Sequence, residues 1–195
     1  MPELQSGSLN TLSTAYFKSL DSNQLYITTD NFNHNNIYDV SILIVSKQTS
    51  QTSPYSSLLS YNTSTGVTWQ IDDISNNGRF NTRIGNTKLK LSTNDILDKW
   101  GIIRLDINYS GNSLKTYYNG SEQYNTTIRR TMPYSGITFR YGANRNNSKF
   151  IEANIAEVLF IPFNYRLKCE GYLAWKWGLT NLLPNNHFYK NEKPI

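Results

Sequence analysis

Planar polar side chains recur at alternate positions along several short segments of this sequence, and such groups could bind the hydroxyls of a sugar. Amide, guanidinium and carboxylate groups form directional hydrogen bonds, and a tyrosine ring can stack on the apolar face of a pyranose. The residues that we expect on an outward sheet face are Gln70, Asn81, Arg83, Arg104, Asp106, Tyr117 and Arg140. A slip of one residue in a strand would turn its members inward, and an ordinary solvated sheet face has the same composition. Glycan binding is therefore a hypothesis.

Residues 100–122 carry the clearest strand signal. Leu105 and Ile107 belong to a run in which apolar and polar residues alternate, and a second alternating run follows at 114–118. A period of two predicts strands with one buried face. A Gly-Asn pair separates the runs and an Asn-Gly pair follows the second, and both pairs favour tight turns. The segment is predicted to be a hairpin.

Other short segments have the same character and are separated by Asn, Asp, Gly or Pro. Residues 40–46 (VSILIVS) are apolar apart from two serines, which predicts a central strand covered on both faces. The remaining predicted strands lie within residues 16–28 (two strands), 57–61, 67–71, 79–84, 87–91, 137–141 and 155–161. Short strands at such spacing indicate a sandwich or a barrel.

The period changes from two to 3.6 over residues 166–177, which predicts a helix. Lys168, Tyr172 and Lys176 form one narrow polar stripe, and most of the other positions are apolar. We therefore expect a largely buried helix packed against the rim of a sheet. The expected N-cap is Asn164 and the expected stop is Gly178.

Length and composition fit one folded domain. The chain has 195 residues, with 38% apolar and 17% charged residues, and 14 Tyr, 8 Phe and 4 Trp give far more aromatic surface than a disordered chain carries. We place the domain at residues 15–195. Residues 1–14 are polar and lack a period, and we expect them to form an arm that docks onto neighbouring molecules.

The net charge of +5 permits an acidic partner, but the 19 basic residues are scattered. A mildly basic solvated surface is the preferred interpretation, and nucleic acid is not expected because most aromatic rings occupy predicted core positions. Cys169 is the only cysteine, so no internal disulfide can form, and we expect a packed thiol. The N-terminal residues do not resemble a signal peptide, and no apolar run is long enough to cross a bilayer.

The spacing of the histidine and serine residues gives little support for a metal site or a hydrolase. His34 and His187 are far apart and lack a metal-ligand spacing, and no glycine-flanked serine turn is visible. Four oxygen-bearing residues could contribute to a calcium site, namely Asp72, Asp73, Asn76 and Asn77. Calcium needs six or more oxygens, so an Asx-rich turn is the preferred interpretation and no cofactor is expected.

Three segments resemble a known family. They are YFKSLDSNQLYIT at residues 16–28, Trp100 with the alternating strand and LKTYYNG that follow it, and IAEVLFIPFNYRLKCEGYLAWKWGLTNLLPNNHFYK at 155–190. Together they resemble concanavalin A-like lectin/glucanase (laminin G-like jelly-roll) domains, and the last is similar to the tail of a phage and bacterial branch. The resemblance implies an all-β, antiparallel, two-sheet jelly-roll sandwich with one C-terminal α-helix at about 165–178.

Glycosidases of the resembled superfamily carry two carboxylates in a Glu-x-Asp-x-x-Glu pattern, because one protonates the leaving oxygen while the other attacks. No segment of this chain matches the pattern. Glu152 and Glu157 are five residues apart, so on a strand they point to opposite faces. The preferred interpretation of Glu157 is an ion-pair member, and we do not expect an enzyme.

Two functions remain open. The first is a phage virion protein, made in the host cytoplasm, that serves as a capsid decoration or a tail or fibre subunit, assembles with itself or other virion proteins, and binds host-surface glycans. The second is a free carbohydrate-binding module or lectin. A third and weaker alternative is a hydrolase whose site is not recognised.

Overall fold

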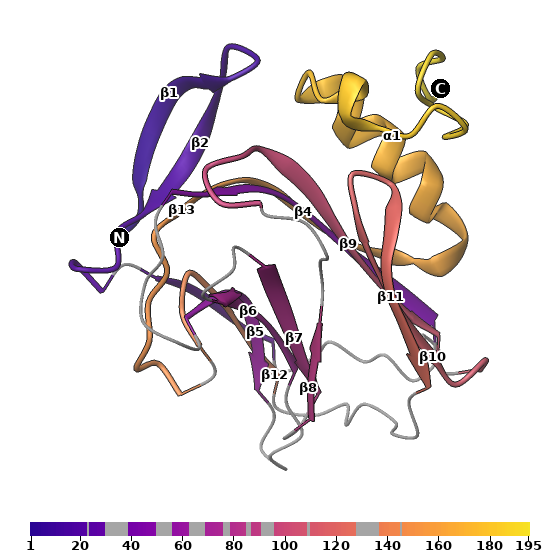
Figure 1. Cartoon of the computed structure of the whole chain (residues 1–195). Helices are drawn as coiled ribbons and strands as arrows, with labels where there is room; N and C mark the ends of the chain where they lie inside the picture. Colours follow the sequence, from indigo (N-terminus) through magenta and orange to yellow (C-terminus); the bar gives the residue numbers. More distant parts are fainter. Residues whose placement is uncertain are drawn as a thin grey trace.

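The protein is represented by a computed structural model that describes residues 1–22, 24–29, 39–49, 56–62, 69–75, 79–84, 87–90, 96–108, 110–127, 137–144 and 146–195. Within these residues the chain forms two antiparallel sheets that pack face to face, with one helix outside them (Figure 1). The predicted all-β, two-sheet class with a C-terminal helix is confirmed.

Two sheets contain all the strands of the described residues. Sheet A has seven strands in the order β1 (Glu3–Leu9), β2 (Leu12–Phe17), β13 (Ala153–Pro162), β4 (Asp39–Gln48), β9 (Gly101–Asn108), β10 (Ser113–Tyr118) and β11 (Ser121–Thr127). Sheet B has six strands in the order β3 (Leu25–Thr29), β12 (Ile137–Tyr141), β5 (Ser57–Asn62), β6 (Trp69–Ser75), β7 (Arg79–Ile84) and β8 (Thr87–Lys90). Non-consecutive neighbours such as β13 and β4 show that the chain crosses repeatedly between the sheets.

Strand β4 connects the two hydrophobic cores of the molecule. Ile42 and Ile44 point into the main core between the sheets, whereas Leu43 and Val45 point into a second core on the outer face of sheet A. All four side chains are fully buried. The prediction that residues 40–46 form a central strand covered on both faces is confirmed, because the helix covers the face that sheet B does not.

The hairpin predicted at residues 100–122 is present as β9 and β10. Their register places Tyr117 opposite Arg104 and Lys115 opposite Asp106. The two-residue turn from β10 to β11 contains Asn119 at φ 50° and Gly120 at φ 79°, the positive angles that this turn requires.

Two strands lie where the sequence predicted none. β11 follows the Asn-Gly turn and forms one edge of sheet A, and β1 forms the other. Residues 1–14, expected to be an arm, contain β1 and the first part of β2, which pairs with β13. A bulge and the left-handed Gly7 interrupt the β1–β2 pairing, and such irregularity hides the period of two. Docking of this hairpin onto neighbours stays a prediction.

Helix α1 (Arg166–Lys176) follows the 3₁₀ turn η1 (Phe163–Tyr165) and precedes the 3₁₀ turn η2 (Thr180–Leu182). Gly178 at φ 69° ends the helix, and the Leu179 N–H donates to the Ala174 carbonyl at 2.8 Å, which is the predicted stop. The predicted N-cap is wrong, because η1 leads directly into α1 and Tyr165 occupies the N-cap position without a side-chain bond.

Helix α1 lies on the outer face of sheet A rather than at its rim, which corrects the sequence-based placement (Figure 1). Leu173, Ala174 and Trp177 pack against Leu43 and other outward residues of β4 and β9. Only one side of the helix is buried. Leu167 and Trp175, which were expected inside, are 42% and 36% exposed. No helix of the described residues is long and apolar enough to cross a membrane.

Gly171 allows the C-terminal tail to lie directly on α1. A Cβ atom at this position would come within 2.4 Å of the Tyr189 Cβ. We predict that Gly171→Ala destabilises the protein by about 1–3 kcal/mol, although alanine is the better helix former, because the tail must move away. Urea unfolding would measure this change, with the exposed Lys168→Ala as the control on the same helix. A Gly171→Ala variant more stable than the wild type would contradict the close packing.

Candidate functional site

The seven residues predicted to share one outward face are divided between the two sheets. Arg104, Asp106 and Tyr117 lie on β9 and β10 of sheet A, whereas Gln70, Asn81, Arg83 and Arg140 lie on β6, β7 and β12 of sheet B. The inner faces of the sheets pack together, so residues facing outward from the two sheets lie on opposite sides of the molecule. The expectation of one shared face is wrong. The side chains of Gln70, Asn81 and Arg83 lie outside the described part of the chain.

Arg104 and Asp106 were expected to face solvent, and this expectation is wrong. Each is only 2% exposed. Both do point outward from sheet A, as the alternation predicted, but α1 covers that part of the sheet. Tyr117 beside them stays half-buried, with the Arg104 guanidinium 3.7 Å from its ring centroid. Glycan binding by Tyr117 or Arg140 remains a prediction that no observation tests.

The covered side chains form an ionic cluster between β9, α1 and the C-terminal tail, which comprises Arg104, Asp106, Arg166, Glu170 and His187. The Arg104 Nη1 donates to Glu170 Oε2, and its Nε lies 3.2 Å from Asp106 Oδ1. The Arg166 Nε lies 3.6 Å from the other Asp106 oxygen. Asp106 also accepts a hydrogen bond of 2.7 Å from Ser41 on β4. The cluster therefore joins a strand pair, the helix and the tail.

Glu170 is the centre of the ionic cluster, and sequence reasoning missed it. Its side chain is fully buried, Oε2 is shared by Arg104 and by His187 Nε2 at 3.2 Å, and Oε1 has no hydrogen-bond partner among the described residues. A signal was available, because Glu170 lies three residues before Leu173 and seven before Trp177, on the apolar side of the helix. A lone acid at such a position needs a buried cation.

Burial controls the electrostatics of the ionic cluster. Burial raises the pKa of Asp106 above its ordinary value, although Arg104 and the Ser41 hydroxyl oppose the shift. Burial also raises the pKa of Tyr117. The side chains of Asp106 and Glu170 are 2% and 0% exposed, so no substrate in solution can reach either carboxylate. The cluster is suited to holding α1 in place and not to catalysis.

The described residues contain no metal-ligand cluster, and their free cysteine is not activated. No group of three or more His, Cys, Asp or Glu there could hold a metal ion. The proposed calcium residues are outside this part of the chain, apart from the backbone of Asp72 and Asp73, and so is His34. Burial raises the pKa of the Cys169 thiol, which keeps it protonated and unreactive near neutral pH.

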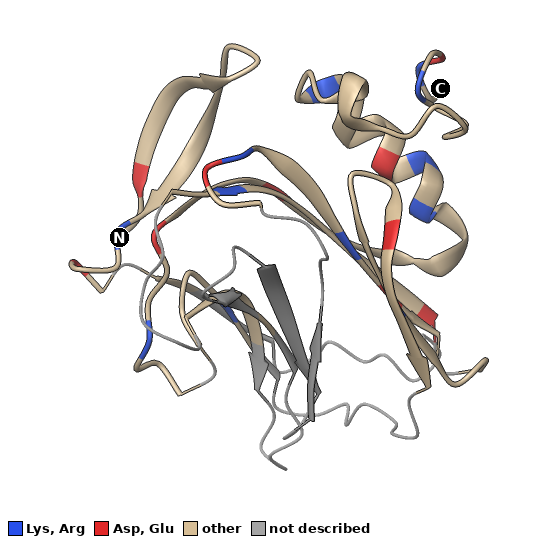
Figure 2. Ribbon diagram, in the orientation of Figure 1, with Lys and Arg blue, Asp and Glu red and all other residues tan. Residues whose placement is uncertain are grey.

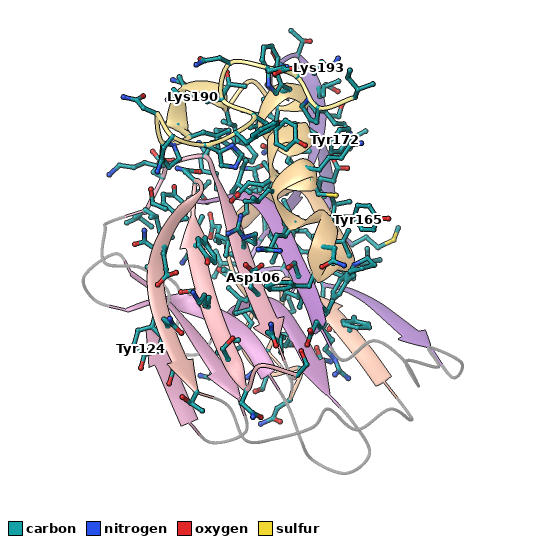
Figure 3. All side chains as sticks on the ribbon, turned by 90° about the vertical axis from the view of Figure 1, so that its right-hand side faces the viewer. Asp106, Tyr124, Tyr165, Tyr172, Lys190 and Lys193 are labelled. Atoms are coloured by element: carbon teal, nitrogen blue, oxygen red, sulfur yellow. The ribbon has the colours of Figure 1, made fainter. Side chains whose placement is uncertain are left out.

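Exposed aromatic rings gather on the solvent side of α1. We call this surface the aromatic face and define it by Tyr165, Lys168, Tyr172, Trp175 and Lys176. The three rings are 58%, 41% and 36% exposed, in sequence order. Residues spaced by three or four positions share one side of a helix, so these five side chains form a continuous stripe. Figure 3 shows Tyr165 and Tyr172 on the same flank of the helix.

Hydrogen bonds hold two rings of the aromatic face through their polar ends. The Trp175 Nε1 donates to the Tyr189 carbonyl at 3.0 Å, and the Tyr172 hydroxyl accepts from Lys176 Nζ at 3.1 Å. Lys176 Nζ also lies 2.8 Å from Glu157 Oε2, which confirms that Glu157 is an ion-pair member. Basic residues occur along α1 and near the C terminus (Figure 2). The face therefore offers fixed rings with charged donors beside them.

Comparison of the fold with known structures finds jelly-roll sandwiches. Trypanosoma rangeli sialidase in complex with the inhibitor DANA matches with a TM-score of 0.59 and 11% identity, over 77% of this chain and 25% of that chain. The carbohydrate esterase vb_24B_21 of Shiga toxin-encoding bacteriophage phi24B matches with a TM-score of 0.56 and 9% identity, over 82% of this chain and 86% of that chain. The heptameric SAP-like pentraxin of Limulus polyphemus matches with a TM-score of 0.51 and 13% identity, over 64% of each chain.

These similarities establish the fold alone, because the identities are low. The chain also spans about a quarter of the sialidase chains that it matches, including NanB of Streptococcus pneumoniae at 26%. No protein-family model and no curated protein matches the sequence. The jelly-roll class implied by the resemblance in sequence is thus supported, and membership of its phage and bacterial branch stays a prediction.

Substitutions of Arg104 and Glu170 should have strongly non-additive effects on the free energy of unfolding. We predict that Arg104→Met and Glu170→Met each cost roughly 3–5 kcal/mol of unfolding free energy, because each leaves a buried charge without its partner in this pair. The double variant should cost much less than the sum of the two, since it leaves neither charge. Guanidinium unfolding of the four proteins would complete this cycle. Additive losses would show that the two charges do not depend on each other.

Asp106 should make stability depend on pH. Its pKa is raised in the folded state, so the folded protein holds this proton more tightly than the unfolded chain. The contribution of Asp106 to folding stability is therefore complete below its ordinary pKa of 3.8. This contribution is lost as pH rises through the folded-state pKa. We predict that the stability of Asp106→Asn relative to wild type rises with pH across this window.

Urea unfolding of both proteins between about pH 3.5 and about pH 7 would measure this difference. The surface variant Asp21→Asn, measured in the same way, controls for the loss of one carboxylate outside the ionic cluster. A relative stability of Asp106→Asn that falls with pH would contradict the prediction, because it would mean that pairing with Arg104 outweighs burial.

Proposed function

We propose that this chain is a non-catalytic carbohydrate-binding module whose aromatic face stacks on the sugar rings of a glycan. The observation that carries the proposal is the row of exposed Tyr165, Tyr172 and Trp175 side chains on a helix whose other side is anchored in the core. Contiguous exposed aromatic surface on a folded protein usually marks a binding site.

The chemistry of the aromatic face suits a sugar. Tyrosine and tryptophan combine an apolar ring with a polar end, and here the polar ends of Tyr172 and Trp175 are already hydrogen-bonded to the protein. The exposed parts of the two rings can contact the C–H surface of a pyranose, and Lys176 Nζ lies 5.4 Å from the Tyr172 ring centroid. Lys168 and Lys176 lie one helical turn on either side of Tyr172 and can donate to hydroxyl or carboxylate groups. Fixed rings also lose little conformational entropy on binding.

The absence of catalysis is part of the proposal and rests on the same geometry. The two carboxylates of the ionic cluster are enclosed, and the carboxylate beside the aromatic face, that of Glu157, is only 17% exposed and is paired with Lys176. Some structural neighbours are named as carbohydrate-acting enzymes, namely the sialidases and the phage esterase. These similarities support an association of the fold with carbohydrate, which is the part of the likeness that we use.

We further propose a virion as the setting, with this chain as a capsid-decorating or tail or fibre subunit that assembles with itself or with other virion proteins. One observation favours it. The phage esterase is similar over 86% of its own chain, so a phage-encoded protein has a fold of nearly this extent. The alternative is a free module in a polysaccharide-binding system. Light scattering tests the setting, because a virion subunit should form defined multimers and a free module a monomer or dimer.

The test of glycan binding uses the exposed indole. We predict that Trp175→Ala weakens binding roughly threefold to tenfold, because it removes one stacking ring. Tyr172→Ala, Trp175→Ala in one chain should weaken it further. The measurement is a screen of the purified protein on neutral and carboxylated polysaccharides, followed by calorimetry on those that bind.

Two controls make the result specific. Leu20→Ala removes an apolar side chain that is 95% exposed and lies outside the aromatic face, and it should leave binding unchanged. Tyr117→Phe tests the face predicted from sequence, because it removes only a hydroxyl on the outer face of β10. Normal binding by the double Tyr172, Trp175 variant would place the glycan elsewhere. Failure of the wild type to bind any glycan would exclude the proposed function.

A further inference from the structure

We propose that His187 is a positioning residue that sets the orientation of the Trp175 indole from inside the protein. The inference rests on the proposed function, since it concerns the same aromatic face. His187 touches no part of that face itself. It acts through the C-terminal tail, which folds back along α1 after Gly178.

The tail is tightly held where it passes α1. The His187 N–H donates to the Pro184 carbonyl at 2.9 Å, and the Lys190 N–H donates to the His187 carbonyl at 3.0 Å. Tyr189 lies directly on Gly171 of the helix, and Phe188 packs edge-on against Tyr189 with ring centroids 4.8 Å apart. These contacts hold the tail against α1, and Figure 3 shows it at the top of the view, where Lys190 and Lys193 are labelled.

A continuous chain of hydrogen bonds runs from the ionic cluster through this tail to the exposed indole. His187 Nε2 lies 3.2 Å from the buried Glu170 Oε2, and the Tyr189 N–H donates to His187 Nδ1 at 3.2 Å. The Tyr189 carbonyl then accepts from Trp175 Nε1 at 3.0 Å. One imidazole thus links a buried carboxylate to the residue that holds the indole.

The two ring nitrogens of His187 have distinct roles. Because Nδ1 accepts from a backbone N–H, it carries no proton, and the neutral ring must carry its proton on Nε2 and donate it to Glu170. The ring is enclosed, with a side-chain exposure of 4%. A Cβ atom on Gly120 would lie 3.2 Å from His187 Cδ2, so the β10–β11 turn lies close to the ring.

The consequence concerns the order of the binding surface. Trp175 is 36% exposed and its indole N–H donates to the Tyr189 carbonyl, so we expect its orientation to depend on that bond. That carbonyl is placed by the adjacent N–H, which binds His187. Loss of the Nδ1 acceptor should free the indole to adopt other rotamers, and a glycan must then order it at a cost in affinity.

Two isosteric variants separate the roles of the nitrogens. In His187→Gln the side-chain amide can replace Nε2 and donate to Glu170, but nothing accepts from the Tyr189 N–H. In His187→Asn the side-chain oxygen can replace Nδ1 and accept from Tyr189, but the donor to Glu170 is lost. We expect His187→Gln to weaken glycan binding roughly twofold to tenfold. We expect His187→Asn to keep the affinity of the wild type and to lose stability instead.

The experiment uses the full chain labelled with 5-fluorotryptophan. The ¹⁹F resonance of Trp175 is assigned with Trp175→Phe, and urea unfolding gives the stability of each variant. A shifted or broadened Trp175 resonance in His187→Gln, with the wild-type resonance retained in His187→Asn, supports the inference. An unchanged resonance in both variants overturns it, as do affinity losses that simply follow the losses of stability.

The outcomes also keep the two proposals apart. The ¹⁹F spectra test the positioning role without any glycan, so they can support it even if the wild type binds no polysaccharide and the proposed function fails. Conversely, a wild type that binds glycan while His187→Gln binds equally well leaves the proposed function intact and overturns the positioning role.

Discussion

The buried ion pair between Arg104 of β9 and Glu170 of α1 is the interaction on which the outer half of the molecule depends. An unpaired charge at either position would be far more costly than an apolar side chain, so the helix has one favourable register on the sheet. Ridges of Leu173, Ala174 and Trp177 supply the apolar contact, but such contact is tolerant of small shifts. The ion pair therefore fixes the register of the helix on the sheet, which apolar packing alone would not fix.

The same register decides which side of α1 meets solvent. With Glu170 turned to the sheet, Tyr172 and Trp175 must turn outward, because they lie on the other side of the helix. The position of the C-terminal tail depends on the same constraint, since His187 binds the oxygen of Glu170 that Arg104 also binds. The buried ionic cluster and the exposed aromatic face are therefore two sides of one arrangement, and the function proposed for one depends on the geometry of the other.

Most of the fold could be predicted because its signals are local. The alternation at Leu105 and Ile107 identifies β9, the apolar run Ile42–Val45 in β4 indicates cover on both faces, and Gly178 ends α1 as expected. The irregular β1 was missed because a bulge breaks its period. The site was predicted poorly for a different reason. Alternation showed that Arg104 points away from the main core, but it carried no information about a helix 60 residues further on that would cover it.

What the sequence by itself determined is the class of most segments and the side of the regular strands that faces the main core, because the side-chain periods of two and 3.6 are properties of the local backbone. Only the tertiary structure decided which strands share a sheet, and hence that Asn81 and Arg104 lie on different sheets. It alone decided that α1 lies on a sheet face, which buries Asp106 and exposes Trp175. These outcomes depend on contacts between distant segments, and pairing of distant segments leaves no period in the sequence.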